Sequence, residues 1–355
     1  HQPTKHKLSN QEEKFLYYMT GTGSISEVSP TTYDFLAMGE IVIDFISNDV
    51  TPSLGDAEHF TRFVGGQATN LALNMSRLNN RTAVAACVGY DGLGQFARLQ
   101  IEQAGINPIF LQTTREAPTT TATITRQTQT PDFIIHRGAD AYLRSSNQLG
   151  DAARSSKIIH TSAFALSREP ARTTILNALN LAHEAGMTIS LDPNYHPDIW
   201  PDKPNFTDIL IDAFQLVDIT KPSLEDCARL FGPRNTPDEY AQIFLDWGAE
   251  IVLISMGERG VYLACATGEQ YEISATENLK VVDVTGAGDA YWAGFLSGYL
   301  QDLEPINAAR MGQAFAEKKI SQVGPLRIVP NWDELNELAS KIKYSPNSTN
   351  KTKIL

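Results

Sequence analysis

Residues 283–295, DVTGAGDAYWAGF, decide the fold of this chain, because an apolar run ends there in glycines and an acid that open a helix. Residues 279–282 are predicted to form a strand, and residues 290–300 have the composition of a helix. Gly286 and Gly288 carry no side chain that would keep a ligand away from the backbone. The N–H groups of residues 286–289 would lie at a helix N-terminus, where unpaired donors and the helix dipole favour an anion.

Asp289 has two interpretations in this setting. An acid in the first turn of a helix is favoured by the helix dipole, so capping alone explains it. The alternative is a general base that takes a proton from a hydroxyl group while nearby amides stabilise a phosphoryl group in transit. The glycine-and-acid pattern by itself does not decide between the two.

The same stretch resembles the signature of the ribokinase-like sugar kinases, also called the phosphofructokinase-B family, in which Asp-x-Thr-Gly-Ala-Gly-Asp precedes a helix carrying Phe and Gly. The matching residues are Asp283, Thr285, Gly286, Ala287, Gly288 and Asp289, followed by Gly294 and Phe295. The resemblance implies that Asp289 activates the acceptor hydroxyl. It also implies an anion hole made by the amides of Gly286, Ala287, Gly288 and Asp289.

A second glycine segment, GGQATNLA at residues 65–72, runs into a helical apolar pattern at residues 73–78. Alone, it indicates a tight turn before a helix. It also resembles the Gly-Gly element of the same family, which implies that Gly65, Gly66 and Asn70 contact sugar hydroxyls. The two signatures occur in the same order along the chain as in the family, which favours sugar contacts by these residues over a simple turn.

Strand-like and helix-like segments alternate along the chain. The expected strands are residues 35–43, 82–88, 157–161, 188–191, 217–220 and 251–255. The expected helices follow Gly66, Gly94, Pro170, Pro222, Pro237 and Gly288. This alternation predicts an α/β fold with a mostly parallel sheet covered by helices on both faces, with ligands beyond the carboxyl ends of the strands. The resemblance implies that these three layers form a ribokinase-like fold.

Residues 50–64 and the Thr-rich residues 118–144 interrupt the alternation, and the second segment has the pattern of strands exposed on one side. The resemblance implies that both form a small β lid over the sugar, and such a lid excludes water from the reacting groups. A free lid edge could pair with a second copy, which makes a homodimer through the lid a candidate assembly.

One kinase domain is expected over residues 33–342. Residues 1–32 are polar and begin with His, so they are expected to be disordered or foreign to the natural chain. Residues 343–355 are expected to form a mobile polar tail.

The composition excludes several classes of protein. An apolar content of 42% and a charged content of 20% are typical of a globular protein, and no apolar run approaches the length of a membrane span. A net charge of −12 argues against binding to nucleic acid. Three cysteines without a C-x-x-C pair predict neither a disulfide framework nor a zinc site, which favours the cytoplasm.

Two segments supply further candidates for sugar contacts. Asp44 follows Glu40 on the same face of the first expected strand, where carboxylates can accept hydrogen bonds from hydroxyls, although a turn role explains Asp44 equally well. Residues 192–196, DPNYH, resemble the Asp-Pro-Asn-x-Arg element of fructokinases and 2-keto-3-deoxygluconate kinases, which implies sugar contacts by Asn194 and His196. Because His196 replaces a fixed bidentate cation, a sugar acid is disfavoured as the substrate.

Arg137, which follows the expected lid, is a candidate to meet a phosphate group, with a solvated arginine as the alternative. Residues 221–226, KPSLED, stand where the family has Asn-x-x-Glu, which implies nucleotide contacts by Lys221 and Ser223. The same resemblance implies that Asp226 holds Mg²⁺ through a water molecule. By spacing alone, Ser223 and Asp226 predict a helix N-terminus.

Residues 255–261, SMGERGV, resemble the nucleotide loop of the family, which implies ATP contacts by Ser255, Gly257 and Gly260, with turn formation as the alternative. Thr285 belongs to the same nucleotide side. Asp283, Thr285 and the Gly324 region also resemble a monovalent-cation site of some relatives, which implies K⁺ at Asp283.

The sequence therefore predicts a sugar kinase that uses ATP and Mg²⁺ to phosphorylate a primary hydroxyl, with fructose or a related ketose as the favoured acceptor. The alternative acceptors are 2-keto-3-deoxygluconate and nucleosides. An alternative of another class is a non-catalytic sugar- or nucleotide-binding protein on a kinase scaffold, which the altered pair Ser223 and Asp226 would permit. No Gly-Lys dipeptide is present, which excludes a P-loop.

Overall fold

The computed structural model describes residues 33–126, 132–200, 203–234, 236–322 and 329–347, all of which belong to one compact unit. The predictions for residues 1–32 and for the Gly324 region lie outside these ranges.

A ten-stranded sheet forms the centre of the described unit, in the order β14-β13-β12-β11-β10-β9-β8-β1-β4-β5. The strands from β11 to β5 in this order pair in parallel, whereas β12, β13 and β14 pair antiparallel at one edge. The strand bounds are β1 (Phe35–Met38), β4 (Thr82–Gly89), β5 (Leu111–Thr114), β8 (Ile158–Ser162), β9 (Thr188–Asp192), β10 (Ile219–Thr220), β11 (Ile251–Ser255), β12 (Val261–Cys265), β13 (Gln270–Ile273) and β14 (Tyr344–Pro346).

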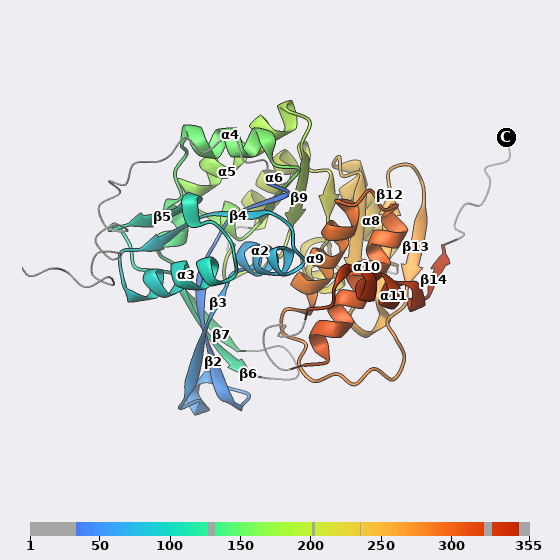
Figure 1. Cartoon of the computed structure of the whole chain (residues 1–355), viewed down its shortest axis with the longest axis horizontal. Coiled ribbons are helices and arrows are strands. Elements are labelled where there is room, and N and C mark those ends of the chain that lie inside the picture. Colours follow the sequence, from blue (N-terminus) through green and yellow to red (C-terminus); the bar gives the residue numbers. More distant parts are fainter. Residues whose placement is uncertain (1–32, 127–131, 201–202, 235, 323–328, 348–355) are drawn as a thin grey trace, which may run out of the picture. The chain divides into compact units, whose positions relative to one another are not determined.

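Helices cover both faces of this sheet (Figure 1). One face carries α2 (Gln67–Arg77), α3 (Gly92–Gln103), α9 (Ala287–Tyr299), α10 (Pro305–Ile320) and α11 (Trp332–Lys341). The other face carries α4 (Asn147–Ser155), α5 (Ala171–Glu184), α6 (Lys203–Phe214), α7 (Leu224–Phe231) and α8 (Pro237–Asp246).

The central strands are apolar on both faces, which is why they form continuous apolar runs in the sequence. In β1, Phe35 and Ala37 belong to one core and Leu36 and Met38 to the other, and all four residues are fully buried. The predicted three-layer α/β arrangement is therefore confirmed.

A separate four-stranded sheet projects away from the main sheet, in the order β3-β2-β6-β7 (Figure 1). Its strands are β2 (Val42–Val50), β3 (Phe60–Gly65), β6 (Thr121–Arg126) and β7 (Phe133–His136). We call this sheet the lid. The expected lid segments 50–64 and 118–144 contain parts of these strands, but β2 begins earlier than expected, and the second segment also contains the short 3₁₀ helix η3 (Ala139–Tyr142).

The order of strands reverses at β1, since β4 and β5 lie on one side of it and β8 to β11 on the other. In open α/β sheets, ligands bind beyond the carboxyl ends of the strands at such a point. The residues after β1 and β8 are therefore well placed to contribute to a site.

Three sequence predictions about elements were wrong. The strand expected at 35–43 is two strands in different sheets, because residues 39–41 turn the chain from β1 into β2. Residues 279–282 form no strand, and Val281 and Val282 are exposed, at 54% and 41%. Residues 344–346, assigned to a mobile tail, pair with β13 as β14.

Within the described ranges, no helix combines the length and apolar character that a bilayer crossing requires. Cys87, Cys227 and Cys265 are buried and unpaired.

Candidate active site

The N-terminus of α9 is built on a left-handed glycine. Gly286 is the N-cap with φ 73°, a conformation that favours glycine, and it ends the loop that brings Asp289 into the first helical turn. The N–H of Ala287 donates to the carbonyl of Val284 at 3.0 Å, so the expected contribution of Ala287 to an anion hole is not supported. Gly288 and Asp289 remain as first-turn residues whose amides have no partner four residues back.

Asp289 is only partly exposed, and the side chain of Asn70 in α2 forms a hydrogen bond with it. Burial raises the pKa of Asp289 to about 7, against the Lys221 ammonium and the Asn70 hydrogen bond, which both favour the charged form. A carboxylate with a pKa near neutrality is suited to act as a general base. Asp289 was predicted from residues 283–295 and Asn70 from residues 65–72. The structure places these two residues side by side.

Asp44 in β2 faces the same region from the lid. Burial, together with the negative charges of Asp289 and Glu40, raises the pKa of Asp44 to about 7. The effect of Asp289 on Asp44 means that the carboxylates of the lid and of α9 lie close enough to interact.

The paired glycines have backbone roles in this arrangement. A Cβ on Gly65 would lie 1.9 Å from Asp44 Oδ2, so only glycine leaves room for that carboxylate. Gly66 is the N-cap of α2 with φ 95°, and a Cβ there would lie 2.6 Å from the carbonyl oxygen of Glu40. Both glycines therefore position neighbours of the site, and direct sugar contacts by Gly65 and Gly66 stay a prediction.

Glu40, directly after β1, is fully buried and was not predicted as a site residue. Its Oε1 accepts hydrogen bonds from the N–H of Gln67 at 2.7 Å and of Ala68 at 3.4 Å, and its Oε2 accepts one from Ser162 Oγ at 2.8 Å. Burial raises the pKa of Glu40. Glu40 thus fixes the N-terminus of α2, which carries Asn70, against β8.

A chain of polar contacts joins β8, α2, β9 and β10 at the carboxyl edge of the sheet. His160 Nδ1 lies 2.9 Å from Ser190 Oγ, and its Nε2 lies 2.9 Å from Gln67 Oε1. Gln67 Nε2 donates to Asp192 Oδ2 at 3.5 Å, and Lys221 Nζ lies 3.2 Å from the same oxygen.

The protonation states along this chain follow from its geometry. Burial and the nearby Lys221 lower the pKa of His160 to about 3, so the imidazole is neutral, and the Gln67 orientation makes His160 Nε2 the donor. Burial alone would lower the pKa of Lys221, but the charges of Asp192 and Asp289 raise it overall. Lys221 is therefore a fixed cation, and a Cβ on Gly288 would lie 3.7 Å from its Nζ.

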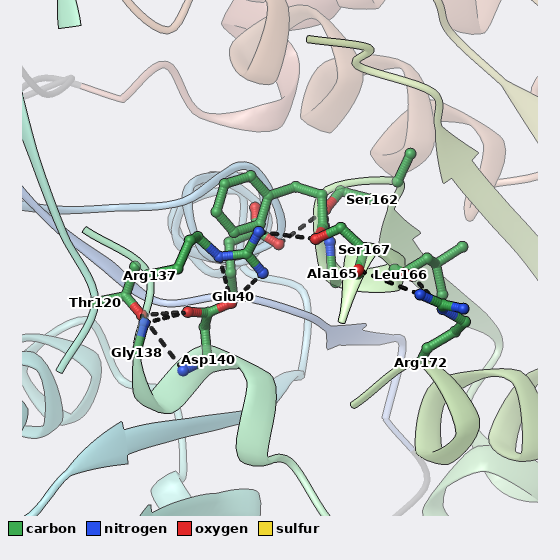
Figure 2. A network of polar contacts seen from close by, with 12 residues as sticks. Glu40, Thr120, Arg137, Gly138, Asp140, Ser162, Ala165, Leu166, Ser167 and Arg172 are labelled. Carbon is green, nitrogen blue, oxygen red and sulfur yellow. Dashed lines mark hydrogen bonds and ion pairs between the residues drawn. The ribbon is translucent and has the colours of Figure 1, made fainter. Parts of the chain in front are cut away.

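Arg137 is held at the base of the lid and is not solvated (Figure 2). Its side chain is 6% exposed and forms an ion pair with Asp140, with Nε 2.9 Å from Asp140 Oδ2. Its Nη1 donates to Ser167 Oγ at 2.8 Å, and the guanidinium lies 4.0 Å from the centre of the Phe164 ring. These contacts join the end of β7 to the 3₁₀ helix η4 (Ala165–Ser167).

The loop after β9 carries Asn194 and His196. Asn194 has φ 28°, and its N–H donates to Asp192 Oδ1 at 3.2 Å. The His196 ring packs edge-on against Phe133 of β7, with 4.8 Å between the ring centres. His196 thus lies beside the lid, as a substrate contact would require.

On the side expected to bind the nucleotide, Ser223 and Asp226 form a capping box at the start of α7. Ser223 Oγ donates to Asp226 Oδ2 at 2.5 Å, and Arg229 Nη1 lies 3.2 Å from Asp226 Oδ1. The helix-start prediction is confirmed. Burial raises the pKa of Asp226, and the charge of Asp192 adds to that shift.

The loop between β11 and β12 has the expected turn chemistry. Ser255 donates its N–H to the carbonyl of Pro222 at 3.0 Å. A Cβ on Gly260, which has φ 91°, would lie 2.0 Å from the carbonyl oxygen of Ile273, so this glycine is required by packing. Gly257 has φ 60° and no atom within 4 Å of an added Cβ, which leaves its surface open to a ligand.

In the loop before α9, the N–H of Thr285 donates to Asp283 Oδ1 at 3.0 Å, and Thr285 is exposed. Asp283 Oδ2 lies 3.8 Å from Lys319 Nζ. Throughout the ranges that the structure describes, no three His, Cys, Asp or Glu side chains form a metal-binding cluster.

Glu40, Gln67, His160 and Asp192 were not among the residues predicted for the site. Glu40 follows β1, Asp192 is the last residue of β9 and Gln67 is the first residue of α2, whereas His160 lies in the middle of β8. Gln67 and Asp192 stood in quoted motifs, and Glu40 stood beside Asp44 in the first expected strand, whereas His160 is connected to the site only through the fold.

The chain is similar in sequence and structure to known carbohydrate kinases. Residues 34–332 match the model of the pfkB family carbohydrate kinases. An ATP-dependent 6-phosphofructokinase from Thermoanaerobacterium thermosaccharolyticum is 30% identical over 306 residues, 86% of this chain and 94% of that protein. A 5-dehydro-2-deoxygluconokinase from Geobacillus kaustophilus is 28% identical over 295 residues, 81% of this chain and 88% of that protein. The structure of Halothermothrix orenii fructokinase superposes with a TM-score of 0.68 at 30% identity, covering 82% of this chain and 99% of that one.

Proposed function

Because the chain belongs to the pfkB family of carbohydrate kinases, we propose that it transfers the γ-phosphoryl group of ATP to the primary hydroxyl of fructose or a related ketose. The observation that carries this proposal is the position of Asp289, with a pKa near 7, in the first turn of α9 beside open amides. A base and an anion site at the same helix N-terminus are what phosphoryl transfer to a hydroxyl requires.

In this proposal, each of the residues at the site has a separate role in the reaction. Asp289 takes the proton of the acceptor hydroxyl, and Asn70 keeps the Asp289 carboxylate in place through their hydrogen bond. The amides of Gly288 and Asp289, with the buried ammonium of Lys221 nearby, stabilise negative charge on the phosphoryl group. Asp44 on the lid and Asn194 after β9 bind the other sugar hydroxyls.

In this proposal, ATP binds at the carboxyl edge of the main sheet, over the half that carries Gly257 and Gly288. A magnesium ion fits near Asp226 because the negative charge of Asp192 acts on the same place, and two neighbouring carboxylates favour a cation. Mg²⁺ would bind there through a water molecule and neutralise the phosphates. Asp226 itself is held by Ser223 and Arg229, so it is pre-oriented for this role.

A second acceptor class, a ketose that already carries a phosphate, is favoured by one observation. A cavity of about 330 Å³ beside β7 is lined by Phe133, Ile134, Ile135, Arg137, Arg168, Asp198 and Ile199. Arg168 is exposed there, and the 6-phosphofructokinase relative supports the same acceptor class. His196, in place of the arginine of the related motif, weighs against sugar acids such as 2-keto-3-deoxygluconate.

Substitution of the base tests the chemistry. Asp289→Asn should fold as the wild type, bind an ATP analogue and lose about 10²–10⁴-fold in kcat, because proton transfer by a positioned base contributes that much. Asp302→Asn, the same chemical change just beyond the other end of α9, is the matched control and should keep the wild-type rate. An Asp289→Asn variant as active as the wild type would exclude the proposed chemistry.

The acceptor is identified by a coupled assay over fructose, fructose 6-phosphate, 2-keto-3-deoxygluconate and a nucleoside. We expect the highest kcat/KM with a ketose. Binding of sugar and ATP without turnover of any acceptor would instead support a non-catalytic binding protein.

A further inference from the structure

Lys319, near the C-terminus of α10, has a buried ammonium group with an unusual environment. The residue is 7% exposed, and within the described ranges its Nζ has no hydrogen-bond acceptor. The carboxylate of Asp283 is its charge partner, with 3.8 Å between Lys319 Nζ and Asp283 Oδ2. A buried ammonium without an acceptor is costly, so its position calls for a functional explanation.

The ammonium lies against the loop that leads into the anion site of α9. The N–H groups of Val282 and Asp283 donate to the carbonyl of Ile320, at 2.7 and 3.2 Å, which fixes this loop to the end of α10. A Cβ on Gly286 would lie 3.9 Å from Lys319 Cε. Lys319 therefore places a positive charge directly behind the N-cap of the catalytic helix.

The same place was expected to hold a monovalent cation, bound by Asp283, Thr285 and the Gly324 region, the last of which lies outside the described residues. The residues do not fit that ion, because a lysine side chain already approaches Asp283 and would repel a second cation. We infer that the ammonium of Lys319 takes the place of the monovalent cation, so that the kinase activity proposed above does not require K⁺.

A fixed ammonium suits this position for two physical reasons. It is a cation at the C-terminus of α10, where the helix dipole favours positive charge. It also adds a positive charge beside Gly286, at the start of α9, without a binding equilibrium. Burial lowers the pKa of Lys319 and Arg77 adds to that shift, whereas the Asp283 carboxylate opposes it.

Cation dependence tests the inference. The wild-type rate should be the same, within about twofold, in K⁺, Na⁺ and tetramethylammonium salts at constant ionic strength. Lys319→Met should lose about tenfold or more of kcat in tetramethylammonium and regain part of it when K⁺ or ammonium ion is added. Lys318→Met, on the adjacent and more exposed position of α10, is the matched control and should behave as the wild type.

Thermal unfolding provides a readout that needs no sugar substrate. K⁺ should raise the melting temperature of Lys319→Met above its value in tetramethylammonium, and should not do so for the wild type. Because this measurement is independent of turnover, failure to find an acceptor would count against the proposed function alone. If Lys319→Met does not fold, Lys319→Arg keeps the charge and should remain independent of K⁺.

Two results would overturn the inference. One is a wild-type enzyme activated or thermally stabilised by K⁺ and not by tetramethylammonium. The other is a Lys319→Met variant that keeps the wild-type rate without any small cation.

Discussion

At the scale of single residues, Asp44 and Asp289 are the most informative pair in the molecule. The pKa of each is raised to about 7, burial is the main cause for both, and the negative charge of Asp289 adds to the shift of Asp44. Raised carboxylate pKa values of this size cluster at functional sites. The sequence predicted both residues, but their electrostatic coupling arises only from the position of the lid.

Asn70 lowers the pKa of Asp289. Its hydrogen bond favours the charged form of Asp289, so the Asn70→Ala substitution should raise the pKa of that carboxyl. We expect the acidic limb of the pH profile of kcat/KM, near pH 7 in the wild type, to move upward by about one unit. Asn180→Ala, at an exposed position of α5, is the control and should leave the limb in place. An unchanged limb in Asn70→Ala would show that Asn70 does not act on the base.

At the scale of elements, the contact between α9 and α10 positions α9 and with it Asp289. A Cβ on Gly294 of α9 would lie 2.9 Å from both Gly312 Cα and the carbonyl oxygen of Met311 in α10. The two helices therefore approach each other at the level of the backbone. This packing also brings Lys319 of α10 to the loop before α9.

Gly294→Ala tests this contact. Backbone atoms cannot move aside as a side chain can, so we expect a loss of about 1–3 kcal/mol in the free energy of unfolding, measured by denaturant titration. Gly150→Ala in α4 is the matched control, because its nearest contact is the flexible end of Leu181, at 3.3 Å. That change should be neutral or slightly stabilising, since alanine is the better helix former. A Gly294→Ala variant as stable as the wild type would contradict the close helix contact.

The elements also show what the sequence could predict. Strands with continuous apolar runs, such as β4 and β11, were predicted to within a residue, because burial on both faces leaves a clear pattern. The split between β1 and β2 was missed because residues 35–43 remain apolar across the turn. The apolar residues 279–282 predicted a strand, but no neighbouring strand pairs with them within the described ranges.

At the scale of the whole molecule, the carboxyl group of Asp44 lowers stability near neutral pH. The pKa of Asp44 in the folded protein, about 7, lies above its ordinary value of 3.8. The folded state therefore holds a proton that the unfolded state releases, and the stability that depends on it decreases as the pH rises from about 4 to about 7.

Asp44→Asn removes the carboxyl group and therefore this loss of stability with rising pH. We expect the variant to melt increasingly above the wild type as the pH is raised from about 4 to about 8, with a final gap of roughly 2 °C or more. Asp49→Asn, at an exposed position of the same strand, is the control and should show no such widening. A difference in melting temperature that stays constant across the pH series would mean that the pKa of Asp44 is not raised in the folded protein.

The site as a whole was predictable only in part. The residues at α9 and α2 follow from two local signatures, whereas the chain from His160 to Lys221 joins four elements that are far apart in the sequence. No local pattern specifies such a chain, because its members meet only when the parallel strands align at their carboxyl ends.

The direct passage of residues 39–41 from β1 into β2 has a mechanical consequence. A link of this length can extend by no more than about 3.3–3.6 Å per residue, and Gly66 joins β3 to α2 just as directly, so the lid cannot slide away from the main sheet. Asp44 lies close to this link, whereas the distal ends of β2 and β3 lie far from it. We therefore expect the link to hold the Asp44 carboxylate at a nearly constant distance from the carboxyl end of β1.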